Sequence, residues 1–261
     1  MFVFIGVALL YRIFLLSRYI FTTKNCFETC NLSLPSMQQL IPHTILGNTF
    51  LLSTDRCIFW EEEKILLLSD LHLGKTGHFR KEGIAVPQAV LKEDLQRFVT
   101  LLQNFKPDKI FIIGDMFHSH ANKELDFFLK WRKDFASLSM QLIKGNHDIL
   151  KADWYVEAGI EVINEQLTVG NFIFAHNITD CKLQEGQYAF SGHIHPGIAI
   201  SGLGKQSLRF PCFYFGKQYA VLPAFSRFTG TYPVKPKRGE IVYAIIPANH
   251  QKGEQGGMIK L

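Results

Sequence analysis

The chain has 261 residues, of which 47% are hydrophobic and 20% are charged, so it is long enough to bury a substantial core. This composition is ordinary for a globular domain and excludes a disordered, collagen-like or repeat protein. The formal net charge of +5 is mild and suits a polyanionic substrate without requiring one. The five cysteines form no CxxC pair, which favours reduced thiols in a cytoplasmic protein over a disulfide framework or a structural zinc site.

The N-terminus begins with an apolar tract, residues 2–21, that lacks turn signals. Arg12 and Arg18 interrupt it, whereas a membrane span needs about 20 apolar residues. A secretory signal is disfavoured because the tract has no basic leading region and no small-residue cleavage site. Residues 1–36 are therefore either a weak membrane anchor or, the hypothesis we favour, sequence upstream of a translation start at Met37. A membrane is not expected among the partners.

From Met37 onward, the first part of the domain reads as short strands and turns, followed by alternating strands and helices. Unbroken apolar runs indicate buried strands, Pro87 suits a first helical turn, and Asn122 can cap a helix. In chain order we expect a strand at 64–68, a helix from Pro87, a strand at 109–113, a helix from Asn122, a strand at 139–143 and a short helix at 150–158. This alternation predicts parallel pairing with right-handed crossovers.

After Gly159, strands joined by turns that contain Gly and Pro predict a second, more antiparallel sheet. The expected strands are 161–163, 172–175, 188–191, 198–201, 208–215, 219–222 and 241–245. The fold class predicted is α/β, with two mixed β-sheets packed face to face and flanking helices (an α/β/β/α sandwich). This domain is expected to span residues 37–247, with a flexible C-terminal tail over 248–261.

Side chains capable of binding metal follow the predicted strands, where open α/β sheets place their sites. The fragments are Asp70-Leu71-His72, Gly114-Asp115-Met116-Phe117-His118, Gly145-Asn146-His147-Asp148, His176 and Gly192-His193-Ile194-His195. Each fragment alone is weak evidence, because a lone DxH is more often a cap or a surface pair, and GNHD is compatible with a simple turn. Their joint occurrence, each behind a buried strand, indicates a metal site.

The candidate ligands are two Asp, one Asn and four His, without a thiolate. Mixed oxygen and nitrogen donors favour Mn²⁺, Fe²⁺ or Zn²⁺ over copper(I) or an iron–sulfur cluster. Seven ligands are too many for one tetrahedral ion but fill two sites that share a carboxylate. Two-metal sites are a standard device for phosphoryl transfer.

The order D-x-H, G-D, G-N-H-[DE], H, G-H-x-H resembles the signature of calcineurin-like metallophosphoesterases, which include SbcD-type repair nucleases. The resemblance implies that one metal is held by Asp70, His72 and His195, that the other is held by Asn146, His176 and His193, and that Asp115 bridges both. It also implies that a water or hydroxide between two ions, most plausibly Mn²⁺, attacks phosphorus in line.

Three further residues are assigned catalytic roles by the same resemblance. His147 would protonate the leaving oxygen or stabilise the transition state, Asp148 would orient it, and His118 matches a histidine that helps catalysis in the nuclease branch.

A closer resemblance covers about residues 40–245. The stretches DLHLGKTGHFRKEGIAVP, PCFYF and LPAFSRFTG are similar to the bacterial group called PdeM, or ligase-associated DNA damage response endonuclease. This implies DNA as the substrate, a role in DNA repair, a cytoplasmic location and a functional link to a DNA ligase and a helicase. The group's usual PAFGxFTGG reads PAFSRFTGT here, which puts any role of that loop in doubt.

Substrate contacts are less sharply indicated. Lys75 and Arg80 are candidates to hold a substrate phosphate, with a solvated basic loop as the alternative. Phe210, Phe213, Tyr214 and Phe215 resemble base-stacking residues, but their alternation favours a place in the core. The KPKR turn at 235–238 suits a nucleic-acid backbone or plain solvent.

Three functions remain open from the sequence. The first is a DNA endonuclease or phosphodiesterase, and the second is an enzyme of the same fold that acts on a small phosphodiester or a nucleotide pyrophosphate. The third is a metal-binding scaffold without catalysis, which the complete set of ligands disfavours.

Overall fold

The computed structural model describes residues 39–75, 83, 89–118, 123–202, 206–248 and 256–261. All of these residues belong to one compact unit, Gln38–Leu261. The N-terminal extension expected over residues 1–36, Arg80, Pro87 and the Asn122 cap lie outside the described residues. Within those that are described, no helix is both long and apolar enough to cross a membrane.

The first sheet has seven strands whose spatial order follows the sequence. Its N-terminal strands pair antiparallel, and β4 to β7 pair parallel, as the strand–helix alternation predicts. The strands are β1 (Leu40–Ile45), β2 (Asn48–Ser53), β3 (Cys57–Trp60), β4 (Ile65–Ser69), β5 (Lys109–Ile113), β6 (Ser139–Ile143) and β7 (Glu161–Ile163). All five residues of β4 are buried, as expected of a strand that is covered on both faces.

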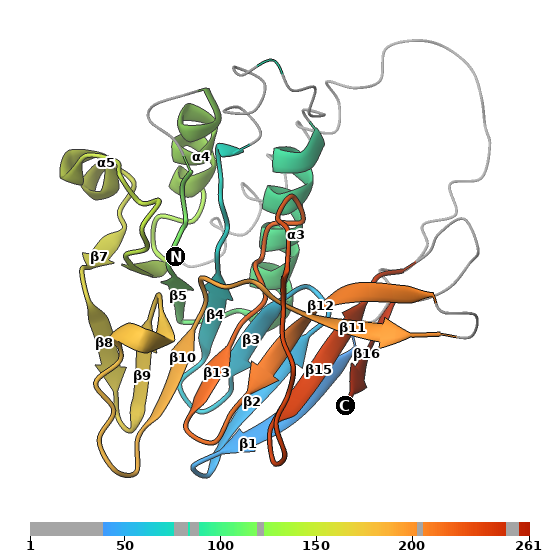
Figure 1. Ribbon diagram of the computed structural model, residues 1–261. Coiled ribbons are helices and arrows are strands. Elements are labelled where there is room, and N and C mark those ends of the chain that lie inside the picture. The colour runs from blue at the N-terminus through green and yellow to red at the C-terminus, as the bar shows by residue number, and fades with distance from the viewer. Residues whose placement is uncertain (1–38, 76–82, 84–88, 119–122, 203–205, 249–255) are drawn as a thin grey trace, which may run out of the picture. The chain divides into compact units, whose positions relative to one another are not determined.

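Three helices pack on one face of this sheet: α3 (Ala89–Phe105), α4 (Lys123–Lys133) and α5 (Ala152–Glu157) (Figure 1). Helix α3 turns Leu95, Phe98 and Leu101 toward the sheet, where they are at most 4% exposed. The same face also buries Asp94 and Arg97, which a purely apolar periodicity did not predict.

The second sheet is mixed, and β9, β10 and β13 run parallel to one another in its centre. Its strands are β8 (Gln166–Val169), β9 (Phe172–Ala175), β10 (Tyr188–Ser191), β11 (Pro196–Ser201), β12 (Ser207–Phe215), β13 (Tyr219–Val221), β14 (Tyr232–Pro233), β15 (Ile241–Ile246) and β16 (Gly257–Lys260). A 3₁₀ turn, η1 (Ile178–Asp180), follows β9.

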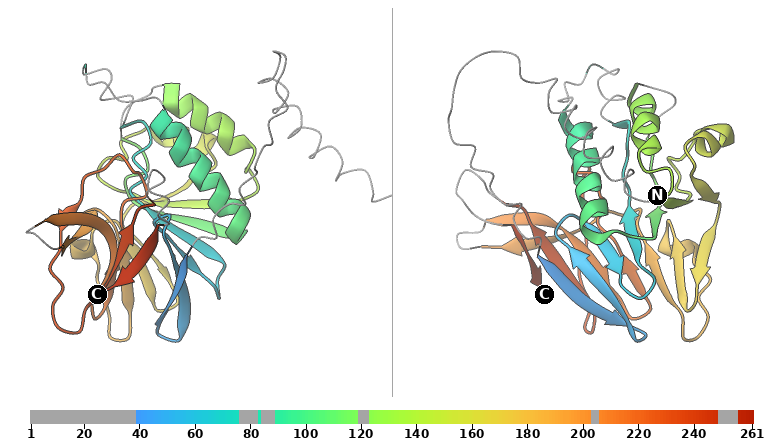
Figure 2. Two further views of the ribbon diagram at one scale, coloured as in Figure 1. Left: turned by 90° about the vertical axis from the view of Figure 1, so that its right-hand side faces the viewer. Right: turned by 180° about the vertical axis from the view of Figure 1, so that it is seen from behind.

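The main core lies between the two sheets and is rich in phenylalanine. Phe50 from the first sheet meets Phe172 and Phe190 from the second, with ring centroids 5.2 and 4.8 Å apart. Fully burying one such side chain contributes roughly 2–3 kcal/mol of transfer free energy. Figure 2 shows the resulting layers of helices, first sheet and second sheet. The fold class predicted from the sequence is therefore confirmed.

The aromatic segment of β12 belongs to the core, as its alternation indicates. Phe213 and Phe215 point between the sheets, whereas Tyr214 joins a smaller apolar cluster on the outer face of the second sheet. In the part of the chain that the structure describes, this outer cluster draws its buried residues from strands and none from the helices α3, α4 and α5.

The C-terminus corrects one prediction. A flexible tail is expected over 248–261, but residues 257–260 form β16, which pairs antiparallel with β15. Met258 is 8% exposed and packs into the main core. The segment GGMIKL is too short to carry a clear periodicity, and its strand depends on a partner earlier in the chain.

Candidate metal centre

The predicted ligands follow the strands whose carboxyl ends meet at one edge of the two sheets. Asp70 follows β4, Asp115 follows β5, Asn146 follows β6, His176 follows β9, and His193 lies two residues beyond β10. The motif backbones are joined directly: His72 N donates to the Asp115 carbonyl at 2.9 Å. Crossover connections that place parallel strands side by side therefore bring distant parts of the sequence together.

The first group of donor atoms comprises Asp70, His72 and His195, whose candidate ligand atoms all lie within 4.8 Å of one another. His72 Nε2 lies 3.2 Å from His195 Nε2, and His195 Nε2 lies 3.5 Å from Asp70 Oδ1. Asp70 is fully buried, and its carboxylate accepts hydrogen bonds from the Ser69 hydroxyl and the His193 backbone amide.

The second group comprises Asp115, His176 and His193. His176 Nε2 is its centre, 3.0 Å from both His193 Nδ1 and Asn146 Oδ1, and 3.6 Å from Asp115 Oδ1. The two groups adjoin, because His176 Nδ1 lies 4.0 Å from Asp70 Oδ1 of the first group.

These distances fit divalent metal ions. Bonds of about 2.1 Å to nitrogen or oxygen place neighbouring ligands roughly 3.0–3.5 Å apart in octahedral or tetrahedral geometry. The donor pairs at 3.0, 3.2 and 3.5 Å agree with that spacing. In addition, Nδ1 of His176 is buried and makes no hydrogen bond within the described residues, a costly arrangement unless another partner is present.

The backbone at the ligands is strained. Asp70, His72, Asp115, His193 and His195 have φ between 46° and 70°, the left-handed region that residues with a Cβ disfavour. Each such residue costs about 1–3 kcal/mol and persists where the surroundings over-determine it, which is typical of functional sites.

Two glycines in the motifs are required by close approach. A Cβ on Gly145 would lie 2.2 Å from Asp115 Oδ1, and a Cβ on Gly192 would lie 2.5 Å from Asp70 Oδ2. Each glycine therefore lets one loop of the site pass directly over a carboxylate that a different loop supplies.

The electrostatics keep the donors in forms that bind metal. Burial, aided by Lys75 and the neighbouring histidines, lowers the pKa of His72 to about 3, so its imidazole is neutral at neutral pH. Burial would raise the pKa of Asp70, but hydrogen bonding and charge from His195, with help from His176 and Ser69, outweigh it and lower that pKa. A neutral imidazole beside an ionised carboxylate is the state a divalent cation needs.

Two further predicted residues lie beside the first group. The rings of His118 and His147 are 4.5 Å apart, and each lies within 5.7 Å of the His72 ring, measured between centroids. The His147 backbone amide donates to Asp115 Oδ1 at 2.9 Å, so the loop that carries the catalytic candidate is fixed to a proposed ligand.

Asp148 has different partners from those expected. Its two oxygens accept hydrogen bonds from the backbone amides of Phe117, at 3.0 Å, and Gly145, at 2.9 Å, and the side chain is fully buried. The expectation that Asp148 orients the His147 ring is therefore revised: the carboxylate joins the loop after β5 to the loop after β6 beneath the site.

Replacing Asp148 by Ala should destabilise the protein by about 2–6 kcal/mol, because two buried amides would each lose a partner at about 1–3 kcal/mol. Urea denaturation of the metal-free protein measures this, with Asp126→Ala on the exposed side of α4 as a control. A loss no larger than that of the control would show that Asp148 does not join the loops.

Asp148 should also give the stability a pH dependence. Burial raises its pKa to about 7, so between pH of about 4, the value in the unfolded chain, and 7 the folded state binds more protons. Stability of the metal-free protein should therefore fall as pH rises through that window, and Asp148→Asn should remove this component. An unchanged slope in that variant would contradict the assignment.

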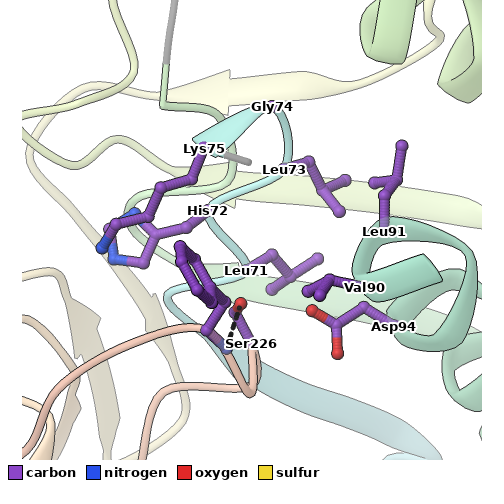
Figure 3. A pocket seen from close by; sticks show the side chains of 10 residues that line it. Leu71, His72, Leu73, Gly74, Lys75, Val90, Leu91, Asp94 and Ser226 are labelled. Carbon is purple, nitrogen blue, oxygen red and sulfur yellow. Dashed lines mark hydrogen bonds between the residues drawn. The ribbon is translucent and has the colours of Figure 1, made fainter. Parts of the chain in front are cut away.

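A small pocket adjoins the first group and is shown in Figure 3. His72 and Lys75 lie on one side, Val90, Leu91 and Asp94 from α3 lie on the other, and Leu71 lies between them. Lys75 is half-buried, and burial lowers its pKa although Asp115 and Asp70 act to raise it. Lys75, a predicted substrate contact, is thus close enough to Asp70 and Asp115 to interact with them electrostatically. Arg80, the other predicted contact, is outside the described residues.

Sequence reasoning missed the contribution of the segment around Ser226. Phe225 N donates to the Ser69 carbonyl at 2.7 Å, and Ser226 N lies 3.4 Å from the Asp70 carbonyl. The LPAFSRFTG loop, whose role the sequence left in doubt, therefore lies directly against the first metal motif.

Comparison with known proteins agrees with this geometry. Residues 63–178 match the family model of calcineurin-like phosphoesterases, a stretch that contains Asp70, His72, Asp115, Asn146 and His176. Over this stretch the chain carries a calcineurin-like phosphoesterase domain. No curated protein sequence matches the chain.

Two solved structures similar to this phosphoesterase are informative to different degrees. The nuclease MPE of Pseudomonas putida is 28% identical, with a TM-score of 0.67, over 79% of this chain and 96% of its own. The phosphoesterase Yfce of Escherichia coli is 11% identical, with a TM-score of 0.39, over 75% of this chain and 97% of its own.

Proposed function

We propose that this phosphoesterase is a DNA endonuclease or phosphodiesterase that depends on two divalent metal ions, most plausibly Mn²⁺. The observation that carries the proposal is the pair of adjoining donor groups, Asp70–His72–His195 and Asp115–His176–His193. A nucleic acid is favoured over small phosphodiesters by similarity to the nuclease of Pseudomonas putida over most of both chains, and DNA is favoured by the resemblance of residues 40–245 to DNA damage response endonucleases.

In this proposal Asn146 completes the second group, and Asp115 is shared by both ions. Bound there, the ions would activate a water molecule for attack on phosphorus and neutralise charge on the phosphoryl oxygens. Lys75 would hold a phosphate oxygen as a point charge, since its side chain lies next to His72 at the mouth of the pocket.

His147 would donate a proton to the leaving oxygen. Its ring is half-buried beside that of His72, and its backbone is held by Asp115. The His118 ring lies 4.5 Å from that of His147 and would help catalysis by holding that ring in place or by contacting the substrate. A role in DNA repair, alongside a ligase and a helicase in the cytoplasm, is the setting we propose for this activity.

Incubation of the purified protein with circular DNA and Mn²⁺ tests the proposal. We expect nicking and linearisation that EDTA abolishes. Bis-p-nitrophenyl phosphate, RNA and a nucleotide pyrophosphate are assayed in parallel under the same conditions. Hydrolysis of a small substrate with the DNA left intact would overturn the DNA assignment and favour a small-molecule phosphodiesterase or pyrophosphatase.

A further inference from the structure

Two arginines, the buried Arg97 and the half-buried Arg56, surround the segment 224–226. Arg56, in the turn between β2 and β3, donates from Nη1 to the carbonyls of Ala224, at 3.2 Å, and Ser226, at 2.9 Å. Arg97, on α3, donates from Nη2 to the carbonyl of Phe225. Three consecutive carbonyls of an irregular segment thus each receive a charge-assisted hydrogen bond.

Arg97 is held in turn by neighbouring side chains. Asp94 lies 3.1 Å from Arg97 Nη2, one helical turn away, and hydrogen-bonds the Ser226 side chain and the Arg227 backbone. The Arg97 guanidinium also lies over the Phe225 ring, 4.0 Å from its centroid. Figure 3 shows the Asp94 carboxylate directed from α3 toward Ser226.

Burying these charged side chains costs hydration free energy. Arg97 is 9% exposed and Asp94 is 4% exposed, and ions removed from water lose several kcal/mol of hydration each. Burial lowers the pKa of Arg56 to about 10, which still leaves the side chain cationic at neutral pH. Two buried charges and one half-buried charge therefore converge on a buried segment of three residues.

The other side of segment 224–226 contacts the first metal motif. Phe225 N donates to Ser69 O and Ser226 N approaches Asp70 O, the backbone of the ligand whose φ is 50°. A left-handed Asp persists only if its neighbours hold it there. The arginines therefore support Asp70 through one intervening segment, without touching it.

We propose that Arg56 and Arg97 are positioning residues for the first metal site: by fixing segment 224–226 they hold Asp70 in the geometry that binds the ion. The inference rests on the proposed two-metal function. Loss of an outer residue that orients a metal ligand typically lowers the metal affinity by about 10–100-fold.

The test compares Arg97→Met with Arg132→Met. Arg132 is a suitable control because it is also buried and also donates to backbone carbonyls, but to those of Phe135, Leu138 and Gly159, which follow α4 and α5 and are not part of segment 224–226. Both variants should lose stability. Only Arg97→Met should bind Mn²⁺ at the first metal site about 10–100-fold more weakly. Calorimetry and electron paramagnetic resonance without substrate measure this affinity.

Arg97→Lys and Arg56→Met complete the set. Lysine keeps one donor and should recover part of the affinity, and Arg56→Met serves if Arg97→Met does not fold. Wild-type Mn²⁺ affinity in folded Arg97→Met and Arg56→Met would overturn the inference. Because the readout is metal binding alone, absence of DNA cleavage by the wild type would refute the proposed substrate and leave this result interpretable.

Discussion

Replacing Asp115 by Ala should abolish phosphodiester hydrolysis and release both metal ions. Activity should fall by about 10³-fold or more, the order seen when one member of an interdependent catalytic set is removed. The structure supports such a large effect because Asp115 is 2% exposed, joins the second donor group and fixes the backbone of His147. Elemental analysis should give two Mn²⁺ per wild-type chain and none in the variant.

Asp115→Asn separates the two roles of this residue. The amide oxygen can still accept from the His147 backbone amide, but the negative charge shared between the ions is lost. We expect the variant to fold as the wild type does, judged by circular dichroism, and still to lack metal. Asp126→Ala, an exposed aspartate on α4, is the matched control and should retain both ions. Two bound metals in Asp115→Ala would disprove the bridging role.

Much of the first sheet and its ligands follows from the sequence. Strands β5 and β6 have the predicted bounds: β5 is an apolar run closed by Gly114, and β6 alternates polar and apolar residues before ending in Leu142-Ile143 and Lys144. A ligand directly behind such a strand must lie at the carboxyl edge, so Asp115 and Asn146 could be placed without coordinates. The pattern fails only where a residue's partner is remote in the chain.

Arg97 illustrates this limit. On α3 it occupies the buried face between Asp94 and Phe98, but helical periodicity reports apolar residues and treats a charged one as solvent-exposed. Its partner, Phe225, is 128 residues away. Asp148 is similar: GNHD suggests a neighbour of His147, whereas its real partners include the amide of Phe117, 31 residues earlier. Local sequence patterns therefore identify side chains that can bind a metal, but they do not identify the hydrogen-bond partners that are remote in the chain.

Replacing His147 by Ala should lower the rate of DNA cleavage by about 10²–10⁴-fold, the usual contribution of a general acid. Its side chain is absent from both donor groups, so the variant should retain two Mn²⁺ ions. This combination of intact metal content and slow turnover distinguishes His147 from Asp115. Measurement requires single-turnover rates at saturating Mn²⁺ together with elemental analysis of the same preparation.

The leaving group decides whether His147 acts as an acid. A DNA alkoxide needs a proton to depart, whereas the phenolate released from bis-p-nitrophenyl phosphate does not, so the loss in His147→Ala should be far smaller with the phenyl ester. His118→Ala is the comparison, because its ring lies 4.5 Å from His147 and carries no assigned proton. An equal loss with both substrates in His147→Ala would mean that this residue stabilises charge or binds substrate and does not transfer a proton.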